Sequence, residues 1–382
     1  MEEWKEYRLG DFMEFNPTVK LPKNTMARKV TMDQLVPHCR DIYNWTYEPY
    51  SGGAKFQNGD TIMARITPCL ENGKHAFISF LDDDEIAYGS TEYIVIRGRR
   101  GISDNLFVYY LSHYPEFKNT AVKSMVGSSG RQRAQVDVLE NIMMFLPSLP
   151  VQYGIANFLS SLDDKIEVNR RINDNLQQQI QAFYKTLFVD FEPFKEGEFE
   201  ESELGIIPKG WNVGKLGELI DIKYGKDHKK LLNGSFPVYG SGGLMRYAEK
   251  ALYKGESVLI PRKGTLNNVM YVNEAFWTVD TMFYSVPKVN NIMSFVYIYL
   301  KNKDLSSFNA GSAVPSMTTE ILNNMKVIVP TDGILEEFNK KAFVMFSAIK
   351  QNQQESRRLS CIRDSLLPKL ISGELKINDL TM

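Results

Sequence analysis

The chain contains an internal repeat, and a repeat constrains the architecture of a protein more than any other sequence feature. Trp4, in the sequence WKEYRLGDF, returns as Trp211 in WNVGKLGEL. An apolar heptad pattern from Ile155 to Leu187 returns from Phe338 to Leu370. The copies lie 207 residues apart at their beginnings and 183 residues apart at their ends. We therefore expect two halves that begin and end alike around bodies of different length.

The heptad pattern predicts two long helices that pack on each other. No proline occurs from Val151 to Glu192, and apolar positions recur alternately every four and three residues, as in a coiled-coil seam. Asn169 and Asn352 occupy equivalent seam positions, where a polar residue weakens packing but fixes register. The alternative is two core helices that belong to separate domains. The predicted seam consists of Ile155, Leu162, Ile166, Asn169, Leu176, Ile180, Phe183, Met345, Ile349, Asn352, Leu359 and Leu366.

The two bodies are predicted to be mixed α/β globules. Each contains short β-like runs broken by turn residues, one helix-like segment (104–114 and about 294–301), and a closing apolar strand (142–147 and 325–330). The expected class is α+β, with two mixed α/β bodies and two long helices that pack either in parallel or as an antiparallel coiled coil; the antiparallel arrangement would relate the two halves by a pseudo-two-fold axis. The predicted segments are a first body (1–148), a first helix (149–190), a linker (191–209), a second body (210–330), and a second helix with a C-terminal tail (331–375).

The charge is unevenly distributed along the chain, although its net value is only −1. Residues 205–330 carry +6 (15 bases, 9 acids), and residues 151–204 carry −6 (5 bases, 11 acids). A protein that meets DNA through small surfaces needs positive charge only where the duplex lies. Ordinary scatter in charge is the alternative explanation.

The sequence lacks the common phosphate-binding, dinucleotide-binding and adenine-methylating motifs. The chain has no GxxxxGK[ST] phosphate loop, no GxGxxG, and no Asn-Pro-Pro-aromatic sequence, because Thr18 follows Asn16 and Pro17. Its four histidines lack metal-ligand spacing. The acidic run Asp82–Glu85 could hold Mg²⁺, but consecutive residues splay around a turn, so a solvated turn is the favoured interpretation. We expect no catalytic residues, no metal and no cofactor bound by this chain.

The sequence also indicates where such a chain resides. Three distant cysteines and no CxxC pair argue against disulfides, and the charged sequence MEEWKEYRLG is unlike a secretory signal. No apolar run reaches the roughly 18 residues of a membrane span. A cytoplasmic protein without membrane contact is expected.

Several loops suit a DNA surface. The segment 127–133 (GSSGRQR) joins glycines, which allow close backbone approach, to side chains that suit phosphates, guanine and adenine. Its counterpart, 309–317 (NAGSAVPSM), lacks arginine, so the two halves would read different sequences. Gly/Ser clusters also recur at 50–53 and 239–243, although a plain turn is the alternative for any single loop. The candidate DNA-binding residues are Ser51, Gly52, Arg65, Ser128, Ser129, Arg131, Gln132, Arg133, Tyr239, Ser241, Gly242, Arg262, Lys263 and Ser312.

Over essentially its full length the chain resembles the specificity subunit of Type I restriction-modification systems. The resemblance is carried by ELGIIPKG before Trp211, by YGSGG and GESVLIPRKG, and by LPSLPVQYGIANFLSSLDDKIEVNRRIN. The resemblance implies two target-recognition domains, each followed by a long helix, with the helices as an antiparallel spacer. It also implies that each domain reads half of a split site in double-stranded DNA.

The resemblance further implies companion subunits. Two methyltransferase subunits would dock on the helices and neighbouring surfaces, and restriction subunits that translocate and cleave DNA would join the full complex. S-adenosylmethionine, ATP and Mg²⁺ would belong to these partners. One departure concerns Arg363, which stands where the first helix has Ile180 and leaves the register uncertain there.

Two other functions remain open from the sequence. A nuclease or fused methyltransferase acting alone would show activity without added subunits. A coiled-coil scaffold that touches no nucleic acid would show no salt-dependent DNA affinity.

Overall fold

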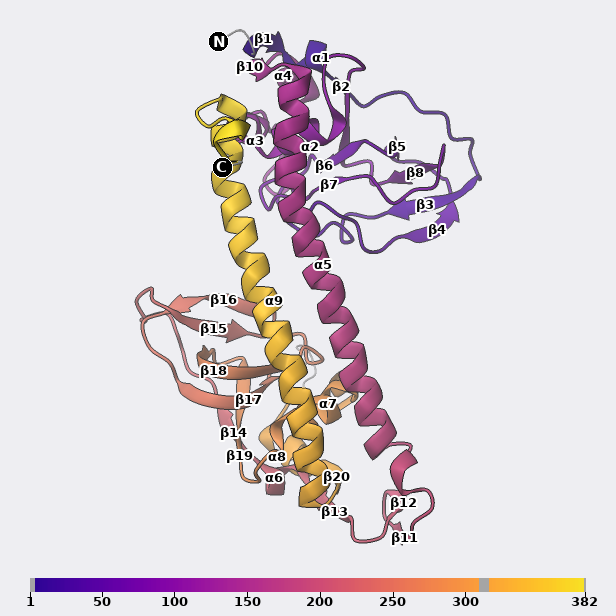
Figure 1. The fold of residues 1–382 in the computed structure, drawn as a ribbon, viewed down its shortest axis with the longest axis vertical. Helices are drawn as coiled ribbons and strands as arrows, with labels where there is room; N and C mark the ends of the chain where they lie inside the picture. Colours follow the sequence, from indigo (N-terminus) through magenta and orange to yellow (C-terminus); the bar gives the residue numbers. More distant parts are fainter. Residues whose placement is uncertain (1–3, 309–315, 381–382) are drawn as a thin grey trace. The chain divides into compact units, whose positions relative to one another are not determined.

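The computed structural model describes residues 4–308 and 316–380, and the chain forms two compact units (Figure 1). Residues 1–171 and 352–382 belong to the first unit, and residues 172–351 belong to the second. Each unit combines a mixed globular part with portions of both long helices, and the predicted α+β class is confirmed. The boundary between the two units passes through both long helices, whereas the sequence predicts each helix (149–190 and 331–375) as a separate segment. The boundaries of the five predicted segments stay a prediction.

The first unit contains two four-stranded sheets and a two-stranded ribbon. The first sheet has the order β2-β9-β6-β7 and is antiparallel throughout. The second has the order β4-β3-β8-β5, with β3 parallel to β8. The strands are β1 (Trp4–Arg8), β2 (Met13–Phe15), β3 (Met26–Val30), β4 (Thr46–Pro49), β5 (Lys55–Gln57), β6 (Thr61–Ala64), β7 (His75–Phe77), β8 (Ile86–Gly89), β9 (Tyr93–Gly98) and β10 (Met143–Pro147), and β1 pairs with β10.

The second unit contains one six-stranded sheet of order β14-β19-β17-β18-β15-β16 and the ribbon β13-β20. Its core includes Phe283, Phe295 and Val258, all fully or almost fully buried. The strands are β13 (Asn212–Lys215), β14 (Ile220–Tyr224), β15 (Phe236–Gly240), β16 (Gly243–Ala248), β17 (Tyr253–Pro261), β18 (Met270–Thr278), β19 (Met282–Pro287) and β20 (Lys326–Val329).

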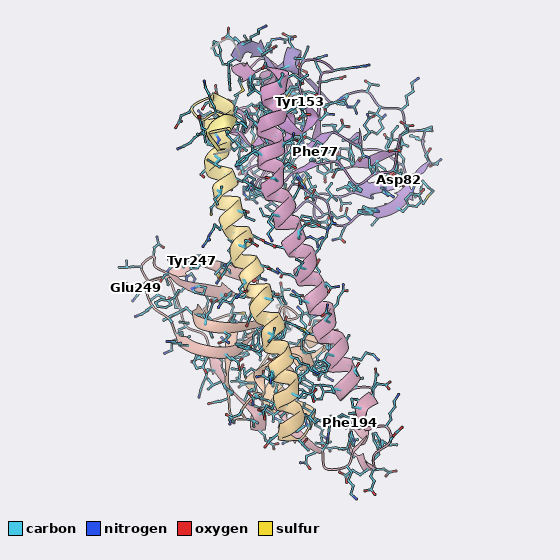
Figure 2. The ribbon with its side chains drawn as sticks, viewed as in Figure 1. Phe77, Asp82, Tyr153, Phe194, Tyr247 and Glu249 are labelled. Atoms are coloured by element: carbon cyan, nitrogen blue, oxygen red, sulfur yellow. The ribbon has the colours of Figure 1, made fainter. Side chains whose placement is uncertain are left out.

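The strand orders show the repeat in three dimensions. The series β14-β19-β17-β18 matches β2-β9-β6-β7, and the parallel pair β15-β18 matches β3-β8. In the second unit the long strand β18 pairs with both β17 and β15. In the first unit two shorter strands take these places: β7 pairs with β6, and β8 pairs with β3. The acidic run Asp82–Glu85 lies between β7 and β8, in a turn where Arg28 binds Asp82 and Glu85. Figure 2 shows Asp82 on the side of the first unit away from α5 (Leu149–Phe188).

Short helices accompany the sheets, and some of them begin with a side-chain cap. Asp104, for example, accepts a hydrogen bond from the backbone N–H of Phe107 at 2.8 Å, which starts α2. The helices are α1 (Leu9–Phe12), α2 (Asn105–His113), α3 (Pro115–Lys123), α4 (Val136–Glu140), α6 (Leu216–Leu219), α7 (Met293–Lys301) and α8 (Thr319–Asn323), with 3-10 helices η1 (Glu192–Phe194), η2 (Leu305–Phe308) and η3 (Ile377–Leu380).

The two long helices, α5 and α9 (Asp332–Ser372), pack on each other and run antiparallel. In the first unit Asp163 of α5 binds Arg363 of α9, and Asn169, further along α5, binds Ser356, which comes earlier in α9. In the second unit the Phe183 and Phe338 rings stack at 5.5 Å between centroids. Each unit therefore pairs one helix with the opposite end of the other; the packing is the one that the heptad pattern predicts, and the antiparallel direction is the one that the resemblance implies.

None of the predicted seam residues is fully exposed to solvent. Ile155, Asn169, Ile180 and Ile349 are buried, and the other eight are half-buried. Arg363, the uncertain position of the seam, is itself 7% exposed and makes a buried ion pair with Asp163. The departure from Ile180 is therefore a change of seam chemistry, from apolar packing to a charge pair.

The connector differs from the linker that its acidic composition predicts. Residues 199–208 form an antiparallel hairpin of β11 (Phe199–Ser202) and β12 (Gly205–Pro208). Aromatic residues hold the connector in place: Trp211 contacts Phe191 and Phe194 at 5.5 and 5.2 Å between ring centroids. The acidic composition correctly indicated that this segment is exposed, but it gave no sign of strands β11 and β12.

Candidate nucleic-acid interface

The Gly/Ser-rich segment 127–133 of the first unit forms a tight loop that is closed by the pairing of Val126 with Arg133. Val126 and Arg133 exchange backbone hydrogen bonds of 3.1 and 3.0 Å and close the loop between them. Gly127 has a φ of 139°, and a Cβ there would lie 2.7 Å from the Arg131 carbonyl oxygen, so the turn requires glycine. Ser128, Ser129 and Arg131 are exposed. The loop can therefore offer hydroxyl, guanidinium and backbone donors to a nucleic acid.

Backbone hydrogen bonds place this loop at the end of β6, beside Arg65. The Thr67 N–H donates to the Gln132 carbonyl at 3.0 Å, and the Ala134 N–H donates to the Arg65 carbonyl at 2.8 Å. The structure thus brings Arg65 together with five candidates that lie more than sixty positions later in the sequence. These candidates are Ser128, Ser129, Arg131, Gln132 and Arg133.

Glu92 is a member of this cluster that sequence reasoning missed. Its carboxylate accepts from Arg133 Nε at 3.0 and 2.9 Å and from Nη2 at 2.6 Å. The hydrogen bonds from Arg133 lower the pKa of Glu92, which keeps the carboxylate ionised. Glu92 lies forty-one positions from Arg133, and no local motif signals the pair.

Ser51 and Gly52 lie on a loop that runs beside the backbone leading to Glu92. A Cβ on Gly53 would collide with the Gly89 carbonyl oxygen, at 1.9 Å, so the two segments touch there. Ser51 and Gly52 themselves are exposed. Their role as DNA contacts stays a prediction.

The second unit assembles a matching cluster at the end of β17. The Met317 N–H donates to the Arg262 carbonyl at 2.9 Å, and Lys263 forms a bridge with Ser316, as Ile66 does with Arg133 in the first unit. Ser312 lies outside the described residues. The repeat therefore places unlike side chains at equivalent strand ends.

The cluster at 239–243 adjoins this strand end. Asn268 donates to the Ser241 carbonyl at 2.8 Å, and a Cβ on Gly264 would lie 3.1 Å from Ser241 Oγ. Gly242 is exposed, whereas the Tyr239 hydroxyl is bonded to Glu274 at 2.9 Å. Ser241 and Gly242 thus lie near Lys263, and Tyr239 also supports the sheet.

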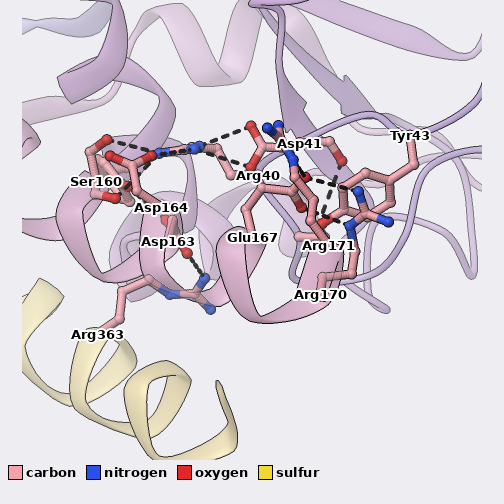
Figure 3. A network of polar contacts seen from close by, with 12 residues as sticks. Arg40, Asp41, Tyr43, Ser160, Asp163, Asp164, Glu167, Arg170, Arg171 and Arg363 are labelled. Atoms are coloured by element: carbon pink, nitrogen blue, oxygen red, sulfur yellow. Dashed lines mark hydrogen bonds and ion pairs between the residues drawn. The ribbon is translucent and has the colours of Figure 1, made fainter. Parts of the chain in front are cut away.

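A polar network fastens the globular body of the first unit to the helices of that unit (Figure 3). Arg40, 11% exposed at its side chain, binds Asp41 at 3.1 Å and Asp164 at 2.7 Å. The Arg170 guanidinium lies 3.9 Å from the centroid of the Tyr43 ring. The heptad pattern carries no sign of these contacts, because Arg40, Asp164 and Arg170 lie off the seam or in loops.

The second unit uses aromatic contacts at the corresponding place. Phe346 of α9 stacks on Tyr271 of β18 with centroids 4.4 Å apart, and Tyr297 contacts both rings. Lys350 of α9 adds an ion pair with Glu274 at 2.9 Å. The two units therefore attach similar bodies to the helices by different chemistry.

Among the described residues, no helix is long and apolar enough to cross a membrane. In the same parts of the chain, no three His, Cys, Asp or Glu side chains gather as a metal site.

A family model described as Type I restriction modification DNA specificity domain matches residues 1–178 and 208–358. The chain belongs to this family. It is thus a DNA-specificity subunit of the Type I restriction-modification kind, a recognition subunit rather than a catalytic one, and the resemblance seen in the sequence is confirmed.

Curated relatives of the specificity subunit agree with this assignment. The Type I restriction enzyme HindI specificity subunit of Haemophilus influenzae is 23% identical over 467 residues, covering 98% of this chain and all of the relative. The MjaIX specificity subunit of Methanocaldococcus jannaschii is 28% identical over 303 residues, with 72% and 70% coverage. The crystal structure of a Type I restriction-modification S subunit from M. genitalium shares the fold, with a TM-score of 0.60, 17% identity and 96% coverage of both chains.

Proposed function

We propose that each unit of this specificity subunit reads one half of a bipartite site in double-stranded DNA. The observation that carries the proposal is the pair of matching clusters at the ends of β6 and β17, which occupy equivalent places but present different side chains. Arginine, glutamine and serine suit base edges and phosphates, and good bidentate base contacts contribute roughly 1–3 kcal/mol each. Unlike clusters at equivalent strand ends would recognise unlike half-sites.

The helices α5 and α9 set the separation of the two readers in this proposal. A continuous antiparallel pair is a stiff connection, and a second reader held by it binds at a raised effective concentration. Two units that each bind a half-site weakly then bind the complete site selectively, and the base pairs between the half-sites are not read.

Two methyltransferase subunits complete the proposed complex by docking on the helices and neighbouring surfaces, and restriction subunits join it. S-adenosylmethionine, ATP and Mg²⁺ belong to those partners. The complex works in the cytoplasm without membrane contact.

The test is the methylation pattern of DNA in a host without other modification systems that expresses this chain with its methyltransferase partner. We expect one bipartite, asymmetric motif with a fixed gap, and no methylation when this chain is omitted. A continuous motif, or methylation that persists without the chain, contradicts the proposal.

A further inference from the structure

Arg133 presents its guanidinium in a fixed direction because Glu92 binds it from one side. The contacts run from Nε and Nη2 of Arg133 to both carboxylate oxygens. Glu92 is itself held, since its N–H donates to Ser90 Oγ at 3.1 Å and its carbonyl accepts from the Arg65 N–H at 2.9 Å. The Arg133 side chain remains 43% exposed. The pair is therefore an ordered group at the surface.

The side-on contact leaves the end of the guanidinium open. A guanidinium has five N–H donors, one on Nε and two on each Nη. Glu92 takes the Nε edge and one side of Nη2, and no described residue accepts a hydrogen bond from Nη1. The Nη1 and Nη2 hydrogens at the tip form a fork aimed away from Glu92.

Building on the proposed DNA-reading function, we propose that Arg133 reads a guanine in the first half-site and that Glu92 is the positioning residue that aims it. Guanine presents two adjacent acceptors, O6 and N7, in the major groove, and they match the open fork. Adenine presents a donor where guanine has O6, so a fixed fork would meet it with like donors. The arrangement therefore discriminates between the two purines.

The same geometry argues against a phosphate clamp at this position. Arg133 and Glu92 together carry no net charge, and the carboxylate would repel a phosphate brought close to it. A neutral pair releases few counterions on binding and adds little to the salt dependence of affinity. Arg133 is thus suited to selecting a base.

The experiment uses the full chain with its methyltransferase partner and sequences the methylated motif. Arg133→Lys keeps the charge but removes the fork, and Glu92→Gln keeps the shape but removes the negative charge. We expect both to relax the same single G·C pair of one half-site, with Arg133→Lys lowering the preference for guanine about tenfold or more. The other half-site should keep its sequence.

Matched controls come from another ion pair of the same unit. Arg8→Lys and Asp11→Asn alter an exposed pair with contacts of 3.0 and 3.1 Å, far from the loop in sequence, and should leave the motif unchanged. If Arg133→Lys abolishes methylation altogether, Glu92→Gln decides: relaxation of one G·C pair supports the proposal, and an unaltered motif overturns it.

The outcomes separate this inference from the proposed function. A wild-type complex that methylates no bipartite motif contradicts the proposed function itself. A bipartite wild-type motif that both variants leave fully intact, or relax in both halves, overturns the assignment of Arg133 and Glu92 alone.

Discussion

Arg363 of α9 and Asp163 of α5 form a buried ion pair across the helix seam, 200 positions apart in the chain (Figure 3). The second carboxylate oxygen of Asp163 accepts from the Tyr110 hydroxyl at 2.6 Å. The pair joins both helices and the recognition body of the first unit in one hydrogen-bonded group. A charge in an otherwise apolar seam restricts which partner position it can face.

Removing one partner of this pair should be far more damaging than removing both. Arg363→Leu leaves the Asp163 carboxylate buried without its counter-charge, and we expect a loss of about 3–5 kcal/mol in the free energy of unfolding. The double variant Asp163→Leu/Arg363→Leu should recover most of that loss. Denaturant unfolding measures both, with Arg8→Leu as an exposed-pair control that should change the free energy of unfolding far less. Equal losses in the single and double variants would contradict the argument.

Asn169 should specify the register of the helix pair at the expense of stability. Its amide donates to Glu355 at 2.8 Å and to Ser356 at 3.3 Å, while its buried Oδ1 has no partner among the described residues. An unsatisfied buried acceptor costs about 1–3 kcal/mol. Asn169→Leu is therefore expected to raise the melting temperature and to admit slipped or intermolecular helix pairing.

Thermal unfolding and light scattering check both effects of this change. Asn175→Leu, at an exposed position of the same helix, is the control and should alter neither the pairing nor, appreciably, the melting temperature. A less stable Asn169→Leu protein would show that the amide contributes more than it costs.

The first unit should lose stability in mild acid because of buried histidines. Burial lowers the pKa of His113 to about 4, and its Nδ1 donates to the Tyr109 carbonyl at 3.1 Å. The His75 ring lies 4.6 Å away, and burial also lowers the pKa of His75. In the described structure Nε2 of neither ring has a partner, so protonation would leave a buried donor unsatisfied.

Because folding lowers the pKa of His113, the folded protein is less stable in acid. The unfolded chain takes up the proton near pH 6.5 and the folded chain only near pH 4, so stability is full above pH 6.5 and falls as the pH drops towards 4. Unfolding free energies measured from pH 7.5 to pH 4 should show this decline, of roughly 3 kcal/mol for His113. His113→Gln should make the decline shallower, while His75 still contributes to it, and an unchanged curve would contradict the assignment.

The aromatic attachment of the second unit should depend on Phe346. Its ring stacks on Tyr271 with an interplanar angle of 24°, and truncation removes that contact and a half-buried apolar surface. We expect Phe346→Ala to cost about 2–3 kcal/mol in unfolding free energy. Val344→Ala, on the same helix and 65% exposed, should stay within about 0.5 kcal/mol. Similar losses in the two variants would contradict the importance of the stack.

Periodicity and repetition predicted the parts of this fold that depend on local pattern. The heptads located both long helices, and Asn169 proved to be a buried polar seam residue, because a single helix face determines burial. Pairings between distant residues left no such signal: Glu92 with Arg133 and Arg40 with Asp164 depend on which loops meet after folding. The connector hairpin was missed because its acidic side chains are those of an exposed loop, although Phe191 and Phe194 anchor it.

The most direct test of the central claim lengthens both helices by one heptad, after Arg171 in α5 and before Asn352 in α9. Seven residues add about 10 Å to a helix, or about three base pairs at 3.4 Å each. The methylated motif of this variant should keep both half-sites while its gap grows by about three base pairs. A gap of unchanged length, or a change in either half-site, would show that the helix pair does not set the distance between the two readers.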